Sequence, residues 1–212
     1  MYLSWSFLSA LMWIQWTPLI CAPWFLPALA TVVLIKPNIT LPLLLTGDFE
    51  KALVERRQWK WAILPAVVLL LSLIWYPHWP AVWYKQVRTY QGISPPLLSM
   101  PLGPIVILSM LNWRDRRAWL LVIFALMPQR MVYDQLPLLL IANSRRQLWI
   151  LVAASWISLA IFLRSNGWGS VPLGWQNFLL ATLYLPAVAM IIWPILRERI
   201  KEFAHLSRSS RS

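Results

Sequence analysis

The sequence predicts an all-α protein, a polytopic bundle of transmembrane helices with about eight hydrophobic segments, several of them short or broken by proline. Three observations support this class. Apolar residues make up 59% of the 212 residues, charged residues make up only 12%, and the mean hydropathy is +0.60. A soluble domain usually carries about 25% charged residues. The apolar residues also gather into runs that short clusters of Lys and Arg separate, which is typical of an integral membrane protein.

The first two segments, residues 3–16 and 18–35, are apolar but irregular. No Lys or Arg precedes Lys36, so the basic start of a secretory signal is missing and we expect residues 3–16 to stay embedded in the mature chain. Proline frees backbone carbonyls that must find partners within protein, so broken helices tend to pack centrally or line a site. The prolines of this region are Pro18, Pro23, Pro27, Pro37 and Pro42.

The third segment, residues 61–77, has Trp residues near both ends, where indole rings favour the headgroup region. Trp61 and Trp75 would lie about 21 Å apart along a helix, less than the roughly 30 Å of a hydrocarbon core. We therefore expect local thinning or protein neighbours. Residues 78–96 follow, with aromatic and aliphatic residues at helical spacing, and predict a helix lying in the membrane interface.

The remaining segments are residues 97–112, 118–128, 132–143, 148–164 and 177–195. The first three of these are shorter than the roughly 20 residues that a spanning helix needs. Residues 164–176 are rich in Gly and Ser and predict a loop. We divide the chain into a transmembrane domain, residues 1–196, and a basic cytoplasmic tail, residues 197–212, whose end "HLSRSSRS" we expect to be disordered.

The basic residues predict the topology. All but four of the 19 fall on one face of this arrangement, and basic loops are retained in the cytoplasm. We therefore expect a multi-pass protein of the bacterial cytoplasmic membrane with both termini cytoplasmic. The residues of this inner group are Lys36, Lys51, Arg56, Arg57, Lys60, Arg114, Arg116, Arg117, Arg145, Arg146, Arg197, Arg199, Lys201, Arg208 and Arg211. The outer group is Lys85, Arg88, Arg130 and Arg164.

Several function classes find no support in the sequence. The formal charge of +12 is divided among short clusters between apolar runs, so it does not indicate a nucleic-acid binder. Cys21, His78 and His205 are the only cysteine and histidines, and none has a second ligand at metal spacing. We expect no metal and no cofactor. No phosphate loop or Ser-His-Asp pattern appears.

The candidate site is the outer turn of a hairpin, "PQRMVYD", residues 128–134. Two interpretations are open. In the first, Arg130 reaches lipid phosphate and Asp134 caps the following helix. In the second, Arg130 binds the phosphate of an anionic lipid-linked substrate, Asp134 fixes its geometry and Tyr133 adds a hydroxyl. Lys36 likewise either extends to the headgroups or contributes to the same enclosed site.

The stretches "IQWTPLICAPWFLPALATVVLIKPNITLPLLLTGDFEKALVERRQWKWAIL" and "MPQRMVYDQLPLLLIA" resemble the C-terminal part of polyprenyl-phosphate-dependent mannosyltransferases of the GT-C superfamily. Lys36, Pro37, Tyr133 and Asp134 match the motif positions. The resemblance implies a multi-helix membrane protein that handles a polyprenyl phosphate sugar at the external face. The family carries its catalytic carboxylate in the first external loop, and residues 16–18, "WTP", hold none. The catalytic residue is therefore unknown, with Asp134 as the remaining candidate.

Two functions remain open at this point. The chain is either a GT-C-like protein, split or degenerate, that transfers a hexosyl group if it is active, or a non-catalytic structural subunit of a larger membrane complex. A small-solute transporter is a third alternative, but few buried polar residues favour it. The expected partners are membrane lipids, polyprenyl phosphate among them, and another membrane protein chain, with no nucleic acid.

Overall fold

The computed structural model describes residues 1, 3–12, 18, 21, 37–46, 60–89, 95–127, 134–166 and 175–209. Within these ranges the chain forms helices and turns without any strand, which confirms the all-α class. In chain order the helices are α1 (Trp5–Met12), α3 (Pro37–Thr46), α5 (Lys60–Trp75), α6 (Trp79–Thr89), the 3₁₀ helices η3 (Pro96–Leu98) and η4 (Gly103–Asn112), α7 (Arg116–Leu126), the 3₁₀ helix η5 (Leu136–Ile141), α9 (Arg145–Asn166), α10 (Trp175–Leu179), the π-helix η7 (Leu180–Tyr184) and α11 (Leu185–Ser209).

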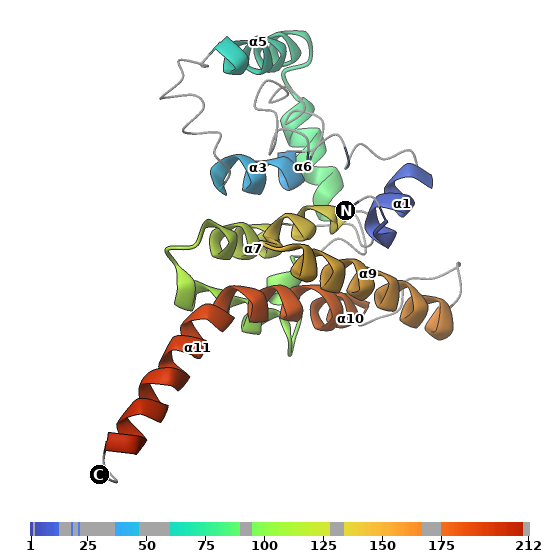
Figure 1. Ribbon diagram of the computed structural model, residues 1–212. Coiled ribbons are helices and arrows are strands. Elements are labelled where there is room, and N and C mark those ends of the chain that lie inside the picture. The colour runs from blue at the N-terminus through green and yellow to red at the C-terminus, as the bar shows by residue number, and fades with distance from the viewer. Residues whose placement is uncertain are drawn as a thin grey trace.

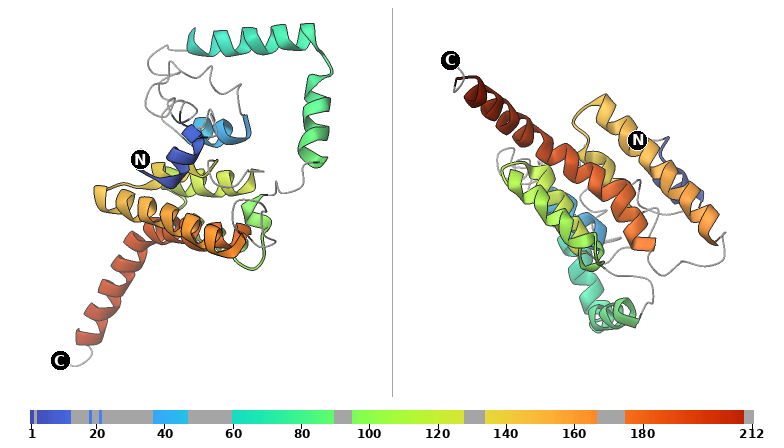
Figure 2. Two further views of the ribbon diagram at one scale, coloured as in Figure 1. Left: turned by 90° about the vertical axis from the view of Figure 1, so that its right-hand side faces the viewer. Right: turned by 90° about the horizontal axis from the view of Figure 1, so that it is seen from below.

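The body of the molecule is a bundle built around α11. The first part of α11 lies beside α9 and runs in the opposite direction, while η4 and α7 pack against it as an antiparallel pair (Figure 1). Ala187, Val188 and Ile191 of α11 are buried in this bundle. From Trp193 to Phe203 its side chains are largely exposed, and the helix extends away from the body (Figure 2).

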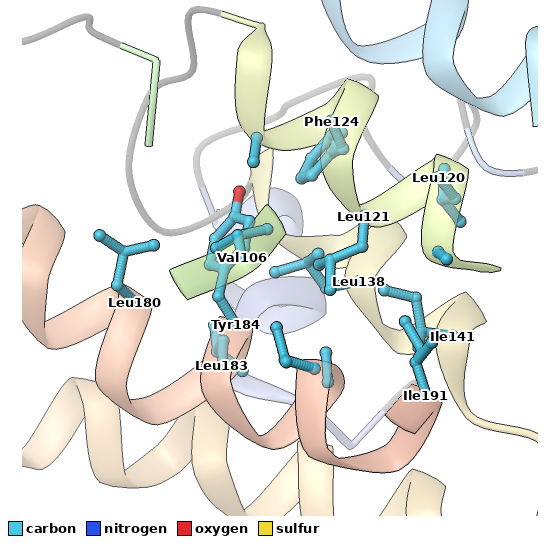
Figure 3. Packing of buried hydrophobic residues seen from close by; sticks show 14 of the residues in the cluster. Val106, Leu120, Leu121, Phe124, Leu138, Ile141, Leu180, Leu183, Tyr184 and Ile191 are labelled. Carbon is cyan, nitrogen blue, oxygen red and sulfur yellow. The ribbon is translucent and has the colours of Figure 1, made fainter. Parts of the chain in front are cut away.

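The main core cluster joins α3, η4, α7, η5, α9, α10, η7 and α11 (Figure 3). Phe124 of α7, Tyr184 of η7 and Leu138 of η5 all have no exposed surface. A second cluster joins η5 to α9 and contains Cys21, Leu136, Leu139, Leu151, Val152 and Met190.

The helix η5 lies between the two clusters. In a 3₁₀ helix residues i and i+3 eclipse each other, so the helix presents straight rows of side chains. Leu136 and Leu139 form one row and belong to the second cluster, whereas Leu138 and Ile141 form another and belong to the main cluster. A short, wholly apolar element is therefore buried on both sides.

The N-terminal end of α7 is held by a cap and an ion pair. Asp115 occupies the N-cap and accepts a hydrogen bond from the Arg117 backbone N–H at 2.9 Å. The Arg117 guanidinium donates to both Asp115 oxygens and, at 3.2 Å, to the carbonyl of Ile141. The start of α7 is thereby tied to the end of η5.

Replacing Asp115 with Ala is expected to destabilise the protein by about 1–2 kcal/mol, the usual cost of losing an N-cap. Partial burial disfavours the charged form of Asp115, but the hydrogen bonds and charge of Arg117 outweigh it and lower the pKa below its ordinary value of 3.8. A lowered folded-state pKa gives stability above pH 3.8 that disappears as the pH falls through the folded value. The free energies of unfolding of the wild type and the Asp115→Ala variant, measured with denaturant, should therefore converge as the pH falls below 3.8. A difference that stays constant with pH would contradict this explanation.

Helices α5 and α6 form an arm that stands off the bundle (Figure 2, left). They meet at 94°, and the Trp79 indole N–H of α6 donates to the Ser72 hydroxyl of α5 at 3.1 Å. Apolar side chains of α5 are exposed on every side of the helix; examples are Leu64, Val67, Val68, Leu70, Leu71 and Ile74. The prediction of a helix near residues 61–77 followed by a second helix is confirmed.

One helix among the described residues, Asn177–Phe203, is long and apolar enough to cross a membrane, and the bent pair of α5 and α6 passes the same criteria together. Two expected segments form helices of another kind: residues 97–112 and 132–143 contain the 3₁₀ helices η4 and η5, each with proline in its first turn. The tail prediction is wrong in part, because α11 continues as a helix to Ser209. The expected segment 18–35 lies almost entirely outside the described residues.

Candidate functional site

Asp134 is a fully buried carboxylate at the entrance to η5. Its exposed fraction is 0%, that of the neighbouring Gln135 is 1%, and Leu136 follows with 0%. Charged side chains are almost never fully buried unless they are paired, because the desolvation cost is large. Such a residue inside an apolar bundle is accordingly a candidate for function.

The start of η5 is built by the residues after Asp134. Gln135 occupies the N-cap position of η5 without a side-chain cap hydrogen bond, and Pro137 lies in the first turn. Proline suits this position because its missing N–H would have no helical partner there. The cap position is thus one residue later than the capping interpretation of Asp134 requires.

The hairpin turn suggested that Asp134 faces either lipid or an internal cavity, and the complete burial of Asp134 favours the internal position. Residues 136–139 directly after it are all buried, and they reach both core clusters. The carboxylate therefore begins an element enclosed by protein, whereas a group at a lipid-facing turn would be exposed.

Lys36, Arg130 and Tyr133, the other predicted site residues, lie outside the described residues. The helix that follows Lys36 is described. It begins at Pro37, packs against α7, and places Ile39 and Leu43 in the core cluster that also contains Phe124 and Leu138. The elements that follow the Lys36-Pro37 motif and Asp134 thus share one cluster.

A polar feature that the sequence analysis missed lies between α1, α9 and η7. The Ser155 hydroxyl accepts a hydrogen bond from the Trp5 backbone N–H at 3.0 Å, and the Trp156 indole donates to the Leu3 carbonyl at 2.8 Å. Farther along α9, the Ser158 and Thr182 hydroxyls are hydrogen-bonded to each other. Ser155 and Ser158 are spaced i, i+3, which places both on one helix face, and this spacing was the signal that could have revealed the contact.

These serines join helices and do not form a catalytic set. Small residues let helices approach closely, and their hydroxyls add interhelical hydrogen bonds. Ser155 and Ser158 also donate to carbonyls within α9, at 2.6 and 3.1 Å. Among the described residues, no group of three or more His, Cys, Asp or Glu side chains could hold a metal ion.

No protein family model, no curated protein and no solved structure matches the chain.

Proposed function

We propose that the chain is a multi-pass membrane protein that binds a polyprenyl phosphate sugar beside Asp134, as the C-terminal portion of a GT-C-like glycosyltransferase. The observation that carries the proposal is the complete burial of the Asp134 carboxylate at the start of η5. A buried carboxylate can accept hydrogen bonds from sugar hydroxyls or pair with a cation in a site that excludes water.

The exposed apolar surface supports the membrane location. An α-helix that is apolar on all sides is normally buried in a protein core or in lipid. The apolar side chains of α5 are exposed on all sides of the helix. The 22 residues of α9 would extend about 33 Å, enough for a hydrocarbon core of about 30 Å. On this proposal α5, α9 and the helix through α11 span the membrane, and α6 lies in the interface at a right angle to α5.

Orientation follows from the basic residues. The N-terminal ends of α7 and α9 carry Arg116, Arg117, Arg145 and Arg146, and we assign this end to the cytoplasm. The opposite end, with α6, is then external. Both termini are cytoplasmic on this assignment, and the expected bacterial cytoplasmic membrane remains part of the proposal.

The proposal assigns binding to this chain and does not assign the chemical step. General-base activation of an acceptor hydroxyl needs a carboxylate within hydrogen-bond reach. Because the loop at residues 16–18 contains no Asp or Glu, we propose that a partner membrane chain supplies the catalytic carboxylate. Asp134, with Lys36, Arg130 and Tyr133, would hold the phosphate sugar.

The test is photo-crosslinking of the purified protein to a polyprenyl phosphate hexose, for the wild type and the variants Asp134→Asn and Arg130→Gln. We expect each variant to lose about tenfold in crosslinking, because each removes a charge-assisted hydrogen bond. Asp115→Asn is the matched control, since it neutralises a mostly buried carboxylate at the start of α7, away from Asp134. Crosslinking that survives in both variants, with thermal midpoints near that of the wild type, would place the site elsewhere.

A structural subunit of a membrane complex is the second candidate, and the all-round exposure of α5 favours it. A partner chain could cover this helix as well as lipid can. In that case the protein should copurify at fixed stoichiometry with an unrelated complex, and the Asp134→Asn variant should assemble normally.

A further inference from the structure

Three arginine-bearing segments meet at one end of the bundle. The Asn112 side-chain amide at the end of η4 donates to the Ile191 carbonyl of α11 at 3.0 Å. Arg117 donates to the Ile141 carbonyl at the end of η5 at 3.2 Å. Arg145 follows Ile141 by four residues and Arg197 follows Ile191 by six, so the contacts gather the arginines of three separate segments.

The arginines at this end are exposed, and two of the segments that carry them contain a single acidic residue. Arg114, Arg116, Arg145 and Arg146 are all exposed. Asp115 is the only acidic residue in residues 112–120 and 141–150, and it is bound to Arg117. The net charge of these two segments is therefore positive.

Exposed tryptophans accompany the arginines. Trp113 and Trp149 are 58% and 56% exposed. The Trp119 indole donates to the Trp113 carbonyl at 2.7 Å, and the Arg114 guanidinium lies 5.5 Å from the centre of the Trp113 ring. We define the basic rim as Trp113, Arg114, Arg116, Arg145, Arg146 and Trp149.

The residue order along two helices distinguishes this rim from an ordinary charged surface. Along η4 and the turn after it, exposed Leu111 precedes Trp113, and Arg114 follows. Along α9 the same order runs in reverse, with Arg145 and Arg146 before Trp149 and exposed Ile150. On both helices, apolar side chains, indoles and guanidinium groups follow one another. A bilayer has the matching order of hydrocarbon core, interface and headgroup phosphates.

We propose that the basic rim binds the phosphate groups of anionic phospholipids in the adjacent leaflet. Arginine offers paired N–H donors that match two phosphate oxygens, and indoles are favoured at the neighbouring depth. A nucleic acid or an acidic protein would satisfy the arginines, but it would leave the exposed apolar side chains of η4 and α9 in water. The inference rests on the proposed membrane location and not on the sugar site at Asp134.

The test adds dioleoyl phosphatidylglycerol, dioleoyl phosphatidylcholine or inorganic phosphate to the full-length protein in neutral detergent. Bound lipid is counted by native mass spectrometry, and thermal unfolding is followed by tryptophan fluorescence. The test variant carries Arg114→Gln, Arg116→Gln, Arg145→Gln and Arg146→Gln. The control carries Lys85→Gln and Arg164→Gln, two exposed cations in α6 and at the far end of α9.

We expect the wild type and the control to retain phosphatidylglycerol over phosphatidylcholine. The test variant should lose about tenfold or more in that retention, given the usual contribution of each basic residue near an anionic surface. Replacement of the same four arginines by Lys keeps the charge and removes the paired donors, so this variant should bind more than the Gln variant and less than the wild type, which separates loss of charge from loss of fold. The Asp134→Asn variant should bind phosphatidylglycerol as the wild type does. A failure of the proposed sugar site can therefore be distinguished from a failure of the basic rim.

Three results would overturn the proposal. Equal retention of phosphatidylglycerol by the test variant and the control would show that the rim is not the binding site. Equal retention of the two lipids by the wild type would remove the role of negative charge. Equal stabilisation by inorganic phosphate would indicate a simple anion site in place of a lipid site.

Discussion

The Gly103→Ala variant is expected to lose about 3 kcal/mol or more of stability, because the added methyl group would overlap main-chain atoms. A Cβ at this position would lie 2.4 Å from the Leu97 carbonyl oxygen and 2.5 Å from that of Pro96. These are backbone atoms, so no side-chain rotation relieves the contact. The Gly103 N–H also donates to the Ser99 carbonyl at 2.7 Å, which holds the glycine in place.

Thermal and denaturant unfolding in detergent measure this effect. Leu98→Ala is the control, since Leu98 lies in the neighbouring η3 and is 71% exposed. The control should unfold within about 0.5 kcal/mol of the wild type, as exposed substitutions usually do. A Gly103→Ala protein that is as stable as the control would contradict the close approach of η3 and η4.

Phe124→Ala is expected to destabilise the bundle by about 3–5 kcal/mol, the usual cost of truncating a buried phenylalanine. Phe124 has no exposed surface and belongs to the cluster that α3, η4, α7, η5, α9, α10, η7 and α11 share (Figure 3). Because these elements enclose it, neither lipid nor water can readily fill the cavity, and the lost contacts are not replaced.

The matched control is Leu126→Ala on the same helix, where the side chain is 47% exposed. Unfolding of the purified proteins should show a much smaller change for this control than for Phe124→Ala. Equal losses for the two variants would mean that α7 does not present Phe124 to the core.

The sequence predicted the helical class and the approximate positions of the longer helices. Apolar runs at 118–128 and 148–164 correspond to α7 and α9, because composition alone distinguishes such runs from basic turns. The kinds of helix were not predictable in the same way. Both η4 and η5 have proline in the first turn, and the hydropathy of a short apolar run does not distinguish a 3₁₀ helix from an α-helix.

The sequence singled out Asp134 as a candidate residue but did not predict how completely its side chain is buried. Asp134 was selected because a carboxylate between two apolar runs is unusual. The hairpin turn left open whether this side chain faces lipid or the interior of the protein, and in the structure it is completely buried. Burial depends on the packing of η5 against α7 and α9 and on a core cluster that also contains side chains of α3, η7 and α11, and a local sequence pattern does not reveal such packing.

The cysteine content of the chain allows a direct topology measurement. Cys21 is the only cysteine and its side chain is buried, so Cys21→Ala provides a background without reactive thiols. Single cysteines are then introduced at Asn143 before α9, at Leu70 in α5 and at Ala81 in α6, three exposed positions. A membrane-impermeant maleimide is applied to intact and permeabilised cells.

We expect Ala81→Cys to react in intact cells, Asn143→Cys to react only after permeabilisation, and Leu70→Cys to stay protected in both. This pattern places α6 outside, the arginine-rich end inside and α5 in the bilayer. Reaction of Asn143→Cys and Ala81→Cys from the same side, or rapid labelling of Leu70→Cys, would contradict the membrane arrangement on which the proposed function depends.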